Sequence, residues 1–442
     1  MIEKNLRTAA LEIFNYALHA VDARTATRNA ISIDQSNLRV KDSEFKLSSR
    51  GVYVVGLGKA SVSMSLGLND VLGERISAAV ISSSAPPTSS QLPSSYRCFL
   101  GGHPFPNQQS LDAARAAFEL LEKANEEKAV VVFLVSGGGS ALLEWPVSDQ
   151  ITLADLQEAN RQLVRSGATI AEINSIRRAF SAIKGGGLAS RGPNAQIVTL
   201  IVSDTNPGDE ASVASGPTLS SPVDSPNAET AIEKYGLVSS LPSSVLNAIR
   251  HHSPTHSPHF QDSPAYVLLD NRAALEAARE KAIDLGFKTN IEEDIVEQPV
   301  DEGSELLLAR VKAHGESTFC SISGGEFSCR VAGEGRGGRN LETVLRCALK
   351  LSEDDARGGY HTVVMSAGTD GVDGSSNAAG AIADENTISR SGTLGLDPNQ
   401  FLQTSDSHSF FQALGDLVVT GPTGTNVRDL RVVLRCKSVV NV

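Results

Sequence analysis

Glycine-rich turns next to polar and charged side chains are the features of this sequence that could carry chemistry. An apolar run over residues 129–135 ends in a glycine turn made of Ser136, Gly137, Gly138, Gly139 and Ser140. Glycines let backbone N–H groups approach a ligand closely, so this turn could hold a phosphate or carboxylate group. A tight strand-to-helix turn without a ligand explains the same residues equally well. Both interpretations stay open on this segment alone.

Single cations in other glycine-rich segments favour the anion site. Lys59 stands in GLGKAS, Lys184 precedes three glycines, and Arg336 and Arg339 lie in GEGRGGRN. The chain as a whole carries a formal net charge of −12, so these cations would make locally positive sites in an acidic protein. Phosphoryl transfer needs such local cations, because its catalysis is mostly positioning and charge neutralisation.

Acidic side chains follow several predicted strands and are candidates for holding Mg²⁺ or for orienting a hydroxyl. They are Asp204, Asp209, Glu326, Asp370 and Asp373. For any one of them alone, an Asx turn or a helix cap is the better explanation. Their occurrence beside the cationic glycine turns supports the functional interpretation.

A second group of polar residues lies in a predicted helix over residues 171–183. An apolar stripe of isoleucines and Phe180 runs along it at helical spacing. One residue ahead runs a polar stripe of Asn174, Arg177, Ser181 and Lys184. Side chains three and four residues apart share a helix face, so this stripe predicts either a binding surface or a solvated face.

Common catalytic signatures do not fit. In the P-loop frame around Lys59, Tyr53 stands where the first glycine is needed and Ala60 where Ser or Thr is needed. The turn GGGSA is not the G-x-S-x-G elbow of serine hydrolases. A G-x-G-x-x-G match at residues 333–338 lacks a clear βαβ context and is weak.

Composition bounds the class of protein. The acidic net charge argues against a general nucleic-acid or anionic-membrane partner and favours a small molecule. The five cysteines include no C-x-x-C pair, which predicts neither a disulfide framework nor a zinc site. No signal peptide and no membrane-spanning run is recognised. We therefore expect a cytoplasmic protein, either a monomer or a homodimer.

Buried-strand runs alternate with helical segments along the first half of the chain. This alternation predicts an α/β fold with a doubly wound parallel sheet. A Ser-, Pro- and His-rich linker over residues 219–264 suggests two domains, residues 1–250 and 251–442, with a strand at 265–269 opening the second. The histidines His251, His252, His256 and His259 in the linker are better explained as solvated than as a metal site.

Laid side by side, the motifs closely resemble those of the glycerate 2-kinase family, whose C-terminal part is called the MOFRL domain. They run in family order over nearly the whole chain. The matching segments are VVGLGKAS, GGHPFPN, LVSGGGSALL, INSIRRAFSAIKGGGLA, IVSDTNPGDEASVASGPT, SGGEFSCRVAGEGRGGRNLE, SAGTDGVDGSSNAAGAIAD and DSHSFFQALGDLVVTGPTGTNVRDL.

The resemblance implies ATP-dependent phosphorylation of D-glycerate on its 2-hydroxyl with Mg²⁺. It also implies a cleft between a Rossmann-like N-terminal domain and a smaller α/β C-terminal domain. Lys59 and Arg339 match basic residues important for catalysis in the family. Departures are mild: Thr205 replaces a hydrophobic residue, His408 replaces a common aromatic one, and residues 219–264 follow no family motif.

The residue patterns and the family resemblance together predict a role for each group of residues. Residues 136–140 and Lys59 would contact the ATP phosphates, and Arg339 and Lys184 would neutralise charge on the transferred group. The polar stripe would hold the glycerate carboxylate, and Asp204 or Asp370 would bind Mg²⁺ or orient the hydroxyl. The alternatives are a nicotinamide-dependent hydroxypyruvate reductase and a nucleotide- or glycerate-binding module without turnover.

Overall fold

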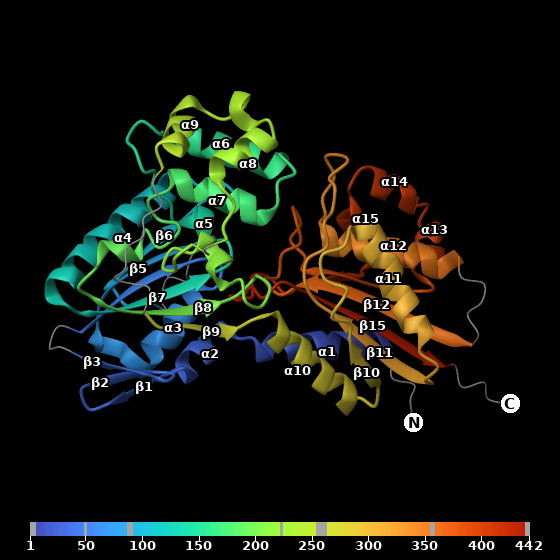
Figure 1. Cartoon of the computed structure of the whole chain (residues 1–442). Helices are drawn as coiled ribbons and strands as arrows, with labels where there is room; N and C mark the ends of the chain where they lie inside the picture. Colours follow the sequence, from blue (N-terminus) through green and yellow to red (C-terminus); the bar gives the residue numbers. More distant parts are fainter. Residues whose placement is uncertain are drawn as a thin grey trace. The chain divides into compact units, whose positions relative to one another are not determined.

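The computed structural model describes residues 6–47, 51–85, 92–221, 224–252, 263–353 and 359–437. The chain divides into two compact units (Figure 1). The N-terminal unit comprises Ala23–Leu269, and the C-terminal unit comprises Met1–Asp22 together with Asp270–Val442. Each unit is an α/β structure with its own six-stranded sheet.

The sheet of the N-terminal unit has the order β6-β5-β4-β7-β8-β9, and all neighbouring strands are parallel. In chain order along this sheet the strands run 3-2-1-4-5-6, as in Rossmann-type folds. The strand order reverses between β4 and β7, which makes the edge beyond their carboxyl ends the topological switch point. The strands are β4 (Val52–Leu57), β5 (Ile76–Ser83), β6 (Tyr96–Leu100), β7 (Val130–Ser136), β8 (Gln196–Val202) and β9 (Ala265–Leu269).

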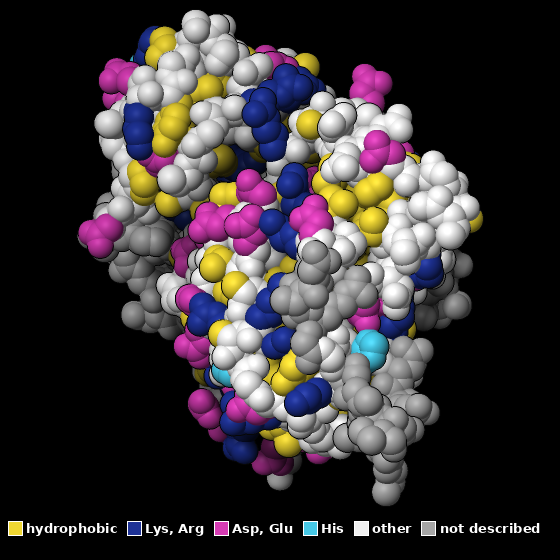
Figure 2. Space-filling view, turned by 90° about the vertical axis from the view of Figure 1, so that its right-hand side faces the viewer, with side chains coloured by type: hydrophobic (Ala, Val, Ile, Leu, Met, Phe, Trp, Pro, Cys, Tyr) yellow, Lys and Arg dark blue, Asp and Glu magenta, His cyan; other side chains and the backbone are white. Residues whose placement is uncertain are grey.

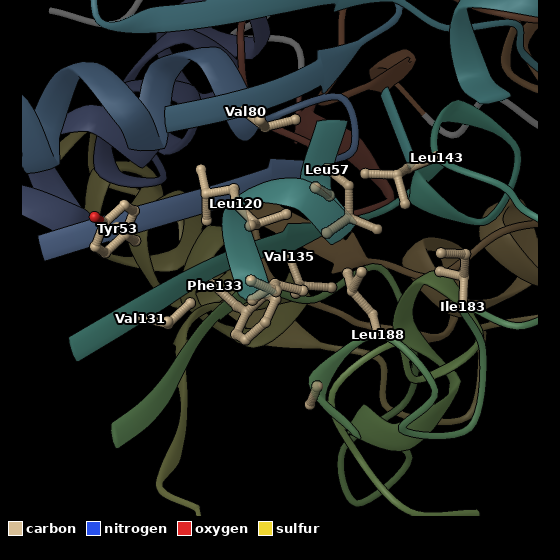
Figure 3. Packing of buried hydrophobic residues seen from close by; sticks show 14 of the residues in the cluster. Tyr53, Leu57, Val80, Leu120, Val131, Phe133, Val135, Leu143, Ile183 and Leu188 are labelled. Atoms are coloured by element: carbon tan, nitrogen blue, oxygen red, sulfur yellow. The ribbon is translucent and has the colours of Figure 1, made fainter. Parts of the chain in front are cut away.

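Burial on both faces explains the unbroken apolar composition of these strands. All residues of β4 and β7 are buried. Alternate side chains of the two strands, including Tyr53 and Phe133, pack with Leu120 of α4 on one face (Figure 3). Helix α3 covers the other face of the same strands. The predicted doubly wound parallel sheet is confirmed.

Helices of this unit begin at polar caps. Asn107, Thr152 and Thr169 each accept a hydrogen bond from the third helical residue, which starts α4, α6 and α7. Helices α6 to α9 form an apolar cluster of their own. The helices are α2 (Ala23–Asn29), α3 (Ser61–Leu72), α4 (Gln108–Glu127), α5 (Gly139–Leu142), α6 (Leu153–Arg165), α7 (Ile170–Phe180), α8 (Ala228–Lys234) and α9 (Ser243–Arg250). A small antiparallel sheet comprises β1 (Ile31–Asp34), β2 (Asn37–Val40) and β3 (Ser43–Lys46).

The C-terminal unit has a mixed sheet of order β10-β11-β15-β12-β13-β14. Only the pair β10 and β11 is parallel among the neighbours that the structure describes. The strands are β10 (Lys288–Ile291), β11 (Thr318–Ser323), β12 (Tyr360–Gly368), β13 (Gly380–Asp384), β14 (Leu417–Val418) and β15 (Asp429–Lys437). Strand β15, the last in the chain, inserts between β11 and β12 and pairs with both.

Helices cover both faces of this sheet. Helices α1 and α10 pack on one face, and α11 and α12 pack on the other (Figure 1). The helices are α1 (Leu6–Ala20), α10 (Asn271–Asp284), α11 (Val300–Ala313), α12 (Arg339–Glu353), α13 (Thr387–Thr393), α14 (Pro398–Gln403) and α15 (Ser407–Leu414).

The predicted domain boundaries differ from the units in two respects. Strand β9 was expected to open the second domain, but it pairs with β8 and completes the first sheet. Helix α1 was assigned to the first domain, but its apolar face lies in the core of the C-terminal unit. Local periodicity predicts both elements correctly, whereas their partners depend on long-range packing that a periodic pattern does not encode.

No helix of the described residues is long and apolar enough to cross a bilayer. In the view of Figure 2, basic, acidic and neutral side chains are intermixed on the surface. Of the histidines in the predicted linker, His251 and His252 are described at the end of α9, and His256 and His259 lie outside the described residues.

Candidate functional site

The carboxyl ends of β4 and β7 bring Lys59 and the glycine turn together. Leu57 of β4 pairs with Val135 of β7, so the turns that follow these strands emerge side by side. The backbone N–H of Lys59 donates to the carbonyl of Gly137 at 2.9 Å. Two segments that are far apart in sequence therefore form one loop cluster at the switch point, the position where Rossmann-type folds bind ligands.

Backbone conformation explains two glycines of this cluster. Gly138 has a φ of +80°, and Gly58 has a φ of +117°. A Cβ on Gly58 would stand 2.2 Å from Oγ and 2.4 Å from the carbonyl oxygen of Ser136. Close packing of the two turns therefore requires a glycine at position 58 whether or not a ligand binds.

Ser136 stabilises the turn from inside. It is fully buried. Its hydroxyl accepts from the N–H of Ala60 at 3.0 Å and lies 3.5 Å from the carbonyl of Leu57. The predicted direct contact of Ser136 with phosphate is therefore not supported by its surroundings. Gly138 and Ser140 are the residues of the turn that are partly exposed, so an anion would meet the loop there.

His103 is a member of the cluster that the sequence prediction missed. A Cβ on Gly138 would stand 3.4 Å from two atoms of the His103 ring and 3.4 Å from Cγ of Lys59. The imidazole and the lysine stem therefore border Gly138. His103 is exposed and precedes a cis peptide bond to Pro104. The motif GGHPFPN was a signal for this residue, but without spatial information it could not be joined to the glycine turn.

The predicted polar stripe is not a helix face. Helix α7 ends at Phe180, and Ser181 is already extended, with φ −116° and ψ 130°. Asn174 and Arg177 lie in the helix, whereas Ser181 and Lys184 follow it. Periodicity extended the helix too far because the polar residues beyond its end continue the same spacing by coincidence.

These side chains nevertheless converge on the glycine turn through an internal network. The ammonium of Lys184 forms an ion pair with Glu144 and donates to the carbonyl of Ser140 at 3.0 Å. The Ser181 hydroxyl donates to Glu144 at 2.5 Å. The Ser140 hydroxyl lies 2.9 Å from that of Ser215.

Asn174 joins this network, whereas Arg177 pairs with Asn160 outside it. The Asn174 amide oxygen accepts from Ser215 at 2.9 Å, and Arg177 donates to Asn160 at 2.8 Å. The side chain of Lys184 is only 1% exposed and that of Glu144 only 2%. Burial lowers the pKa of Lys184, and the Glu144 carboxylate opposes that shift.

The predicted contact of the stripe with a substrate carboxylate is therefore not supported. The hydrogen-bonding groups of Asn174, Ser181 and Lys184 are directed to other protein groups, and the charge of Lys184 is balanced by Glu144. We interpret the network as support for the glycine turn, because Lys184 holds the Ser140 carbonyl.

The acidic candidates of the N-terminal unit have different surroundings. Asp204 follows β8, the neighbour of β7 in the sheet, and is partly exposed. Asp209 accepts from the Ser212 hydroxyl at 2.6 Å and raises the pKa of Arg178 against the larger lowering effect of burial. Asp204 thus lies at the same edge as Lys59, whereas Asp209 is engaged by a hydroxyl and a cation.

Arg339 is anchored by two carboxylates at the start of α12. Its Nε and Nη2 donate to Asp429 at 2.6 and 3.1 Å, and Nη2 also lies 2.9 Å from Glu326. Nη1 has no hydrogen-bond partner among the described residues, and the side chain is 33% exposed. The bidentate contact fixes the guanidinium plane and leaves one terminal nitrogen for an anion.

Electrostatics keeps this pair charged. Burial disfavours the charge on Arg339, but the Asp429 carboxylate outweighs it and raises the pKa of the guanidinium. Burial likewise acts to raise the pKa of Asp429, and Arg339 outweighs it and lowers that pKa. Asp429 was missed from the sequence, because nothing in RDLRVVL distinguishes an arginine-binding carboxylate from an ordinary strand end.

A buried carboxylate caps α12 beside Arg339. Asp373 accepts from the N–H groups of Asn340 at 3.1 Å and of Leu341 at 2.8 Å. Burial raises its pKa to about 7, Asp429 adds to the rise, and the two N–H groups oppose it. Because the pKa of Asp373 is higher in the folded state, folding favours its protonated form. The contribution of this group to the free energy of unfolding is fully present below its unfolded pKa and is lost as the pH rises through about 7.

Metal coordination by protein groups alone has no preformed cage in the described residues. No group of three or more His, Cys, Asp or Glu side chains gathers there. Glu326 is paired with Arg339, and Asp370 accepts from the N–H of Val372 at 3.1 Å in an Asx turn. Mg²⁺ usually takes one or two carboxylates together with substrate phosphates and water, so single acids at loop ends fit that ion.

Known proteins resemble this chain over its whole length. Residues 9–250 match the family described as "Domain of unknown function (DUF4147)", and residues 319–429 match the MOFRL family. The D-glycerate 2-kinase of Thermotoga maritima is 32% identical over 97% of this chain and 98% of its own. This chain belongs to the glycerate 2-kinase family.

One further relative and a solved structure agree with that membership, and another relative carries a different name. The glycerate 2-kinase of Pyrococcus horikoshii is 31% identical, covering 97% of each chain. The crystal structure of the Thermotoga maritima glycerate kinase superposes with a TM-score of 0.77 at 30% identity, covering 98% of this chain and 99% of that one. A protein of Agrobacterium vitis named putative hydroxypyruvate reductase is 37% identical over 75% of this chain and 76% of its own. The predicted family and its fold are confirmed.

Proposed function

We propose that this protein is an ATP-dependent kinase that phosphorylates D-glycerate on its 2-hydroxyl and releases ADP and 2-phosphoglycerate. The observation that carries the proposal is the meeting of Lys59 with Gly137 and Gly138 at the switch point of a Rossmann-type sheet. Relatives named D-glycerate 2-kinase and glycerate kinase support the substrate class.

The N-terminal unit would hold the ATP phosphates. The exposed side of the glycine turn, at Gly138 and Ser140, would contact phosphate oxygens, and the Lys59 ammonium would neutralise their charge. Mg²⁺, when bound, would screen the charge of the transferred phosphoryl group. Asp204 is the carboxylate we propose as its protein ligand, because it closely follows β8, the strand next to β7.

The C-terminal unit would contribute the Arg339 guanidinium, whose Nη1 would donate to the phosphoryl oxygens as charge develops. Glu326 and Asp429 would position Arg339 and would not touch the reacting atoms. Asp370 remains the candidate in this unit for orienting the substrate hydroxyl. The joint use of Lys59 and Arg339 in one cleft stays a prediction.

Substitution of the two cations tests this assignment. We expect Lys59→Met and Arg339→Met each to lower kcat/KM for D-glycerate by about a hundredfold or more, as the loss of a charge-stabilising donor does elsewhere. The assay measures ADP release with D-glycerate and MgATP. Matched controls are Lys46→Met and Arg279→Met, which remove exposed cations from the same units. Turnover near the wild-type rate in either Lys59→Met or Arg339→Met would refute the role of that residue.

The product identifies the acceptor hydroxyl. Phosphorus and proton NMR of the reaction mixture should show 2-phosphoglycerate, and 3-phosphoglycerate would overturn the proposed regiochemistry. The reductase alternative rests on the name of the Agrobacterium vitis relative. It predicts NADH oxidation with hydroxypyruvate in the absence of ATP. A binding module without turnover would bind ATP and form no product.

A further inference from the structure

A cavity lies in the N-terminal unit, and Lys184, which holds the Ser140 carbonyl, is one of the residues that line it. Its volume is about 840 Å³, within the range of small-molecule sites. It is bordered by the end of α7, by the segment 181–191 and by α9. The described residues that line it include neither Lys59, Gly138 nor Asp204. The proposed kinase reaction therefore does not account for this cavity.

The lining has the charge of an anion site. It contains Arg178, Arg191 and two histidines, and no Asp or Glu among its described residues. Lys184 also lines it, but Glu144 balances the charge of that residue. The chain has a net charge of −12, but the two arginines at this cavity give its lining a local positive charge.

Arg178 makes two long hydrogen bonds, and the Asp209 carboxylate offsets part of the cost of burying its charge. The residue is only 8% exposed. Nη1 donates to Ser225 and Nη2 to the carbonyl of Ala211, both at 3.3 Å, and Nε has no hydrogen-bond partner. Leaving a buried donor unsatisfied costs free energy, and the inaccessible Nε could reach an acceptor only if its surroundings rearrange.

Serine hydroxyls and a second arginine line the same cavity. Ser181, Ser190, Ser220, Ser221 and Ser244 line the cavity. The guanidinium of Arg191 stacks over the Phe118 ring at 4.2 Å, which restrains an otherwise exposed side chain. Planar guanidinium forks combined with hydroxyl donors match the several acceptor oxygens of a phosphate group better than a single carboxylate does.

We infer that this cavity binds a small organic anion that carries a phosphate group, with Arg178 as the principal cation and Arg191 as the second. The volume accommodates a metabolite rather than a bare ion. The described lining includes none of the residues Lys59, Gly138 and Asp204, and the inference does not depend on the proposed reaction.

Binding of pyrophosphate to full-length protein tests the inference by isothermal titration calorimetry. The Lys59→Met background removes the cation of the transfer site, so that the remaining binding reports the cavity. We expect pyrophosphate to bind the Lys59→Met protein and to bind Lys59→Met/Arg178→Gln at least about tenfold more weakly, since a charge-assisted hydrogen bond to a buried group is lost. The control Lys59→Met/Arg165→Gln removes an exposed arginine outside the lining and should bind like the background.

Two results would overturn the inference. One is unchanged affinity in Lys59→Met/Arg178→Gln, and the other is no binding to Lys59→Met at pyrophosphate concentrations up to about 10 mM. Should the Arg178 variant fail to fold, Lys59→Met/Arg191→Gln changes an exposed side chain and carries the same test. Its expected result is weaker binding, and an affinity equal to that of the background would also refute the site.

Discussion

At the scale of single residues, the ion pair of Lys184 and Glu144 has the clearest energetic consequence. Both side chains are nearly inaccessible, and Lys184 also holds the carbonyl of Ser140. Taking two charges out of water is costly, and only their mutual attraction and hydrogen bonds offset that cost. Removing one partner leaves the other buried without compensation.

We predict that Glu144→Gln lowers the free energy of unfolding by about 3–5 kcal/mol, measured by urea denaturation. The double variant Glu144→Gln/Lys184→Met should be more stable than Glu144→Gln, because the uncompensated charge is gone. A double variant less stable than Glu144→Gln would mean that Lys184 contributes mainly through its other contacts.

The same residue illustrates what a spacing pattern can miss. The sequence placed Lys184 on a polar stripe with Asn174, but it could not reveal Glu144 as its partner. Glu144 comes from a different segment, with no periodic relation to α7. A burial-driven pairing across the fold has no local signature, so an ammonium predicted to meet a substrate proves to be internal.

At the scale of elements, the packing of the β4 and β7 turns decides where an anion can approach. Gly58 is held against Ser136, and its N–H donates to the carbonyl of Ser82 at 3.2 Å. The turn after β4 therefore contacts both neighbouring strands. Its rigidity is what places Lys59 beside Gly138.

We predict that Gly58→Ala destabilises the protein by about 1–3 kcal/mol more than Gly167→Ala, measured by chemical denaturation. Both glycines have positive φ, but a Cβ at Gly58 meets Ser136 at 2.2 Å and a Cβ at Gly167 meets nothing within 4 Å. The larger loss expected at Gly58 combines this steric overlap with its less favourable φ of +117°, against +73° at Gly167. Equal losses in the two variants would show that the turns can move apart at little cost.

At the scale of the whole molecule, the first helix of the chain, α1, packs in the C-terminal unit. Phe14 and Ile13 of α1 are fully buried in a core that also contains Met365 of β12 and Val432 of β15. An N-terminal helix and a C-terminal strand therefore stabilise the same unit. The integrity of the Arg339 site depends on this packing, because Asp429 begins β15.

We predict that Phe14→Ala lowers the stability of the C-terminal unit by about 3–5 kcal/mol. Hydrogen exchange followed by mass spectrometry should show faster exchange in peptides of β12 and β15. Thr8→Ala, an exposed change on the same helix, should stay within about 0.5 kcal/mol of the wild type. Unchanged exchange in β12 and β15 would contradict the assignment of α1 to this core.

The sequence by itself determined the family, the α/β class, the parallel buried strands and the cationic glycine turns. Those features are local, because apolar runs, glycines and caps impose conformation on their own neighbours. Only the tertiary structure decided that β9 joins the first sheet, that α1 joins the second unit, and that Lys184 serves Glu144 and Ser140. It also showed that His103 lies beside Gly138 and that Asp429 accepts two hydrogen bonds from Arg339. These are choices of partner between distant segments, and they follow from complementary burial and charge, which no spacing along the chain records.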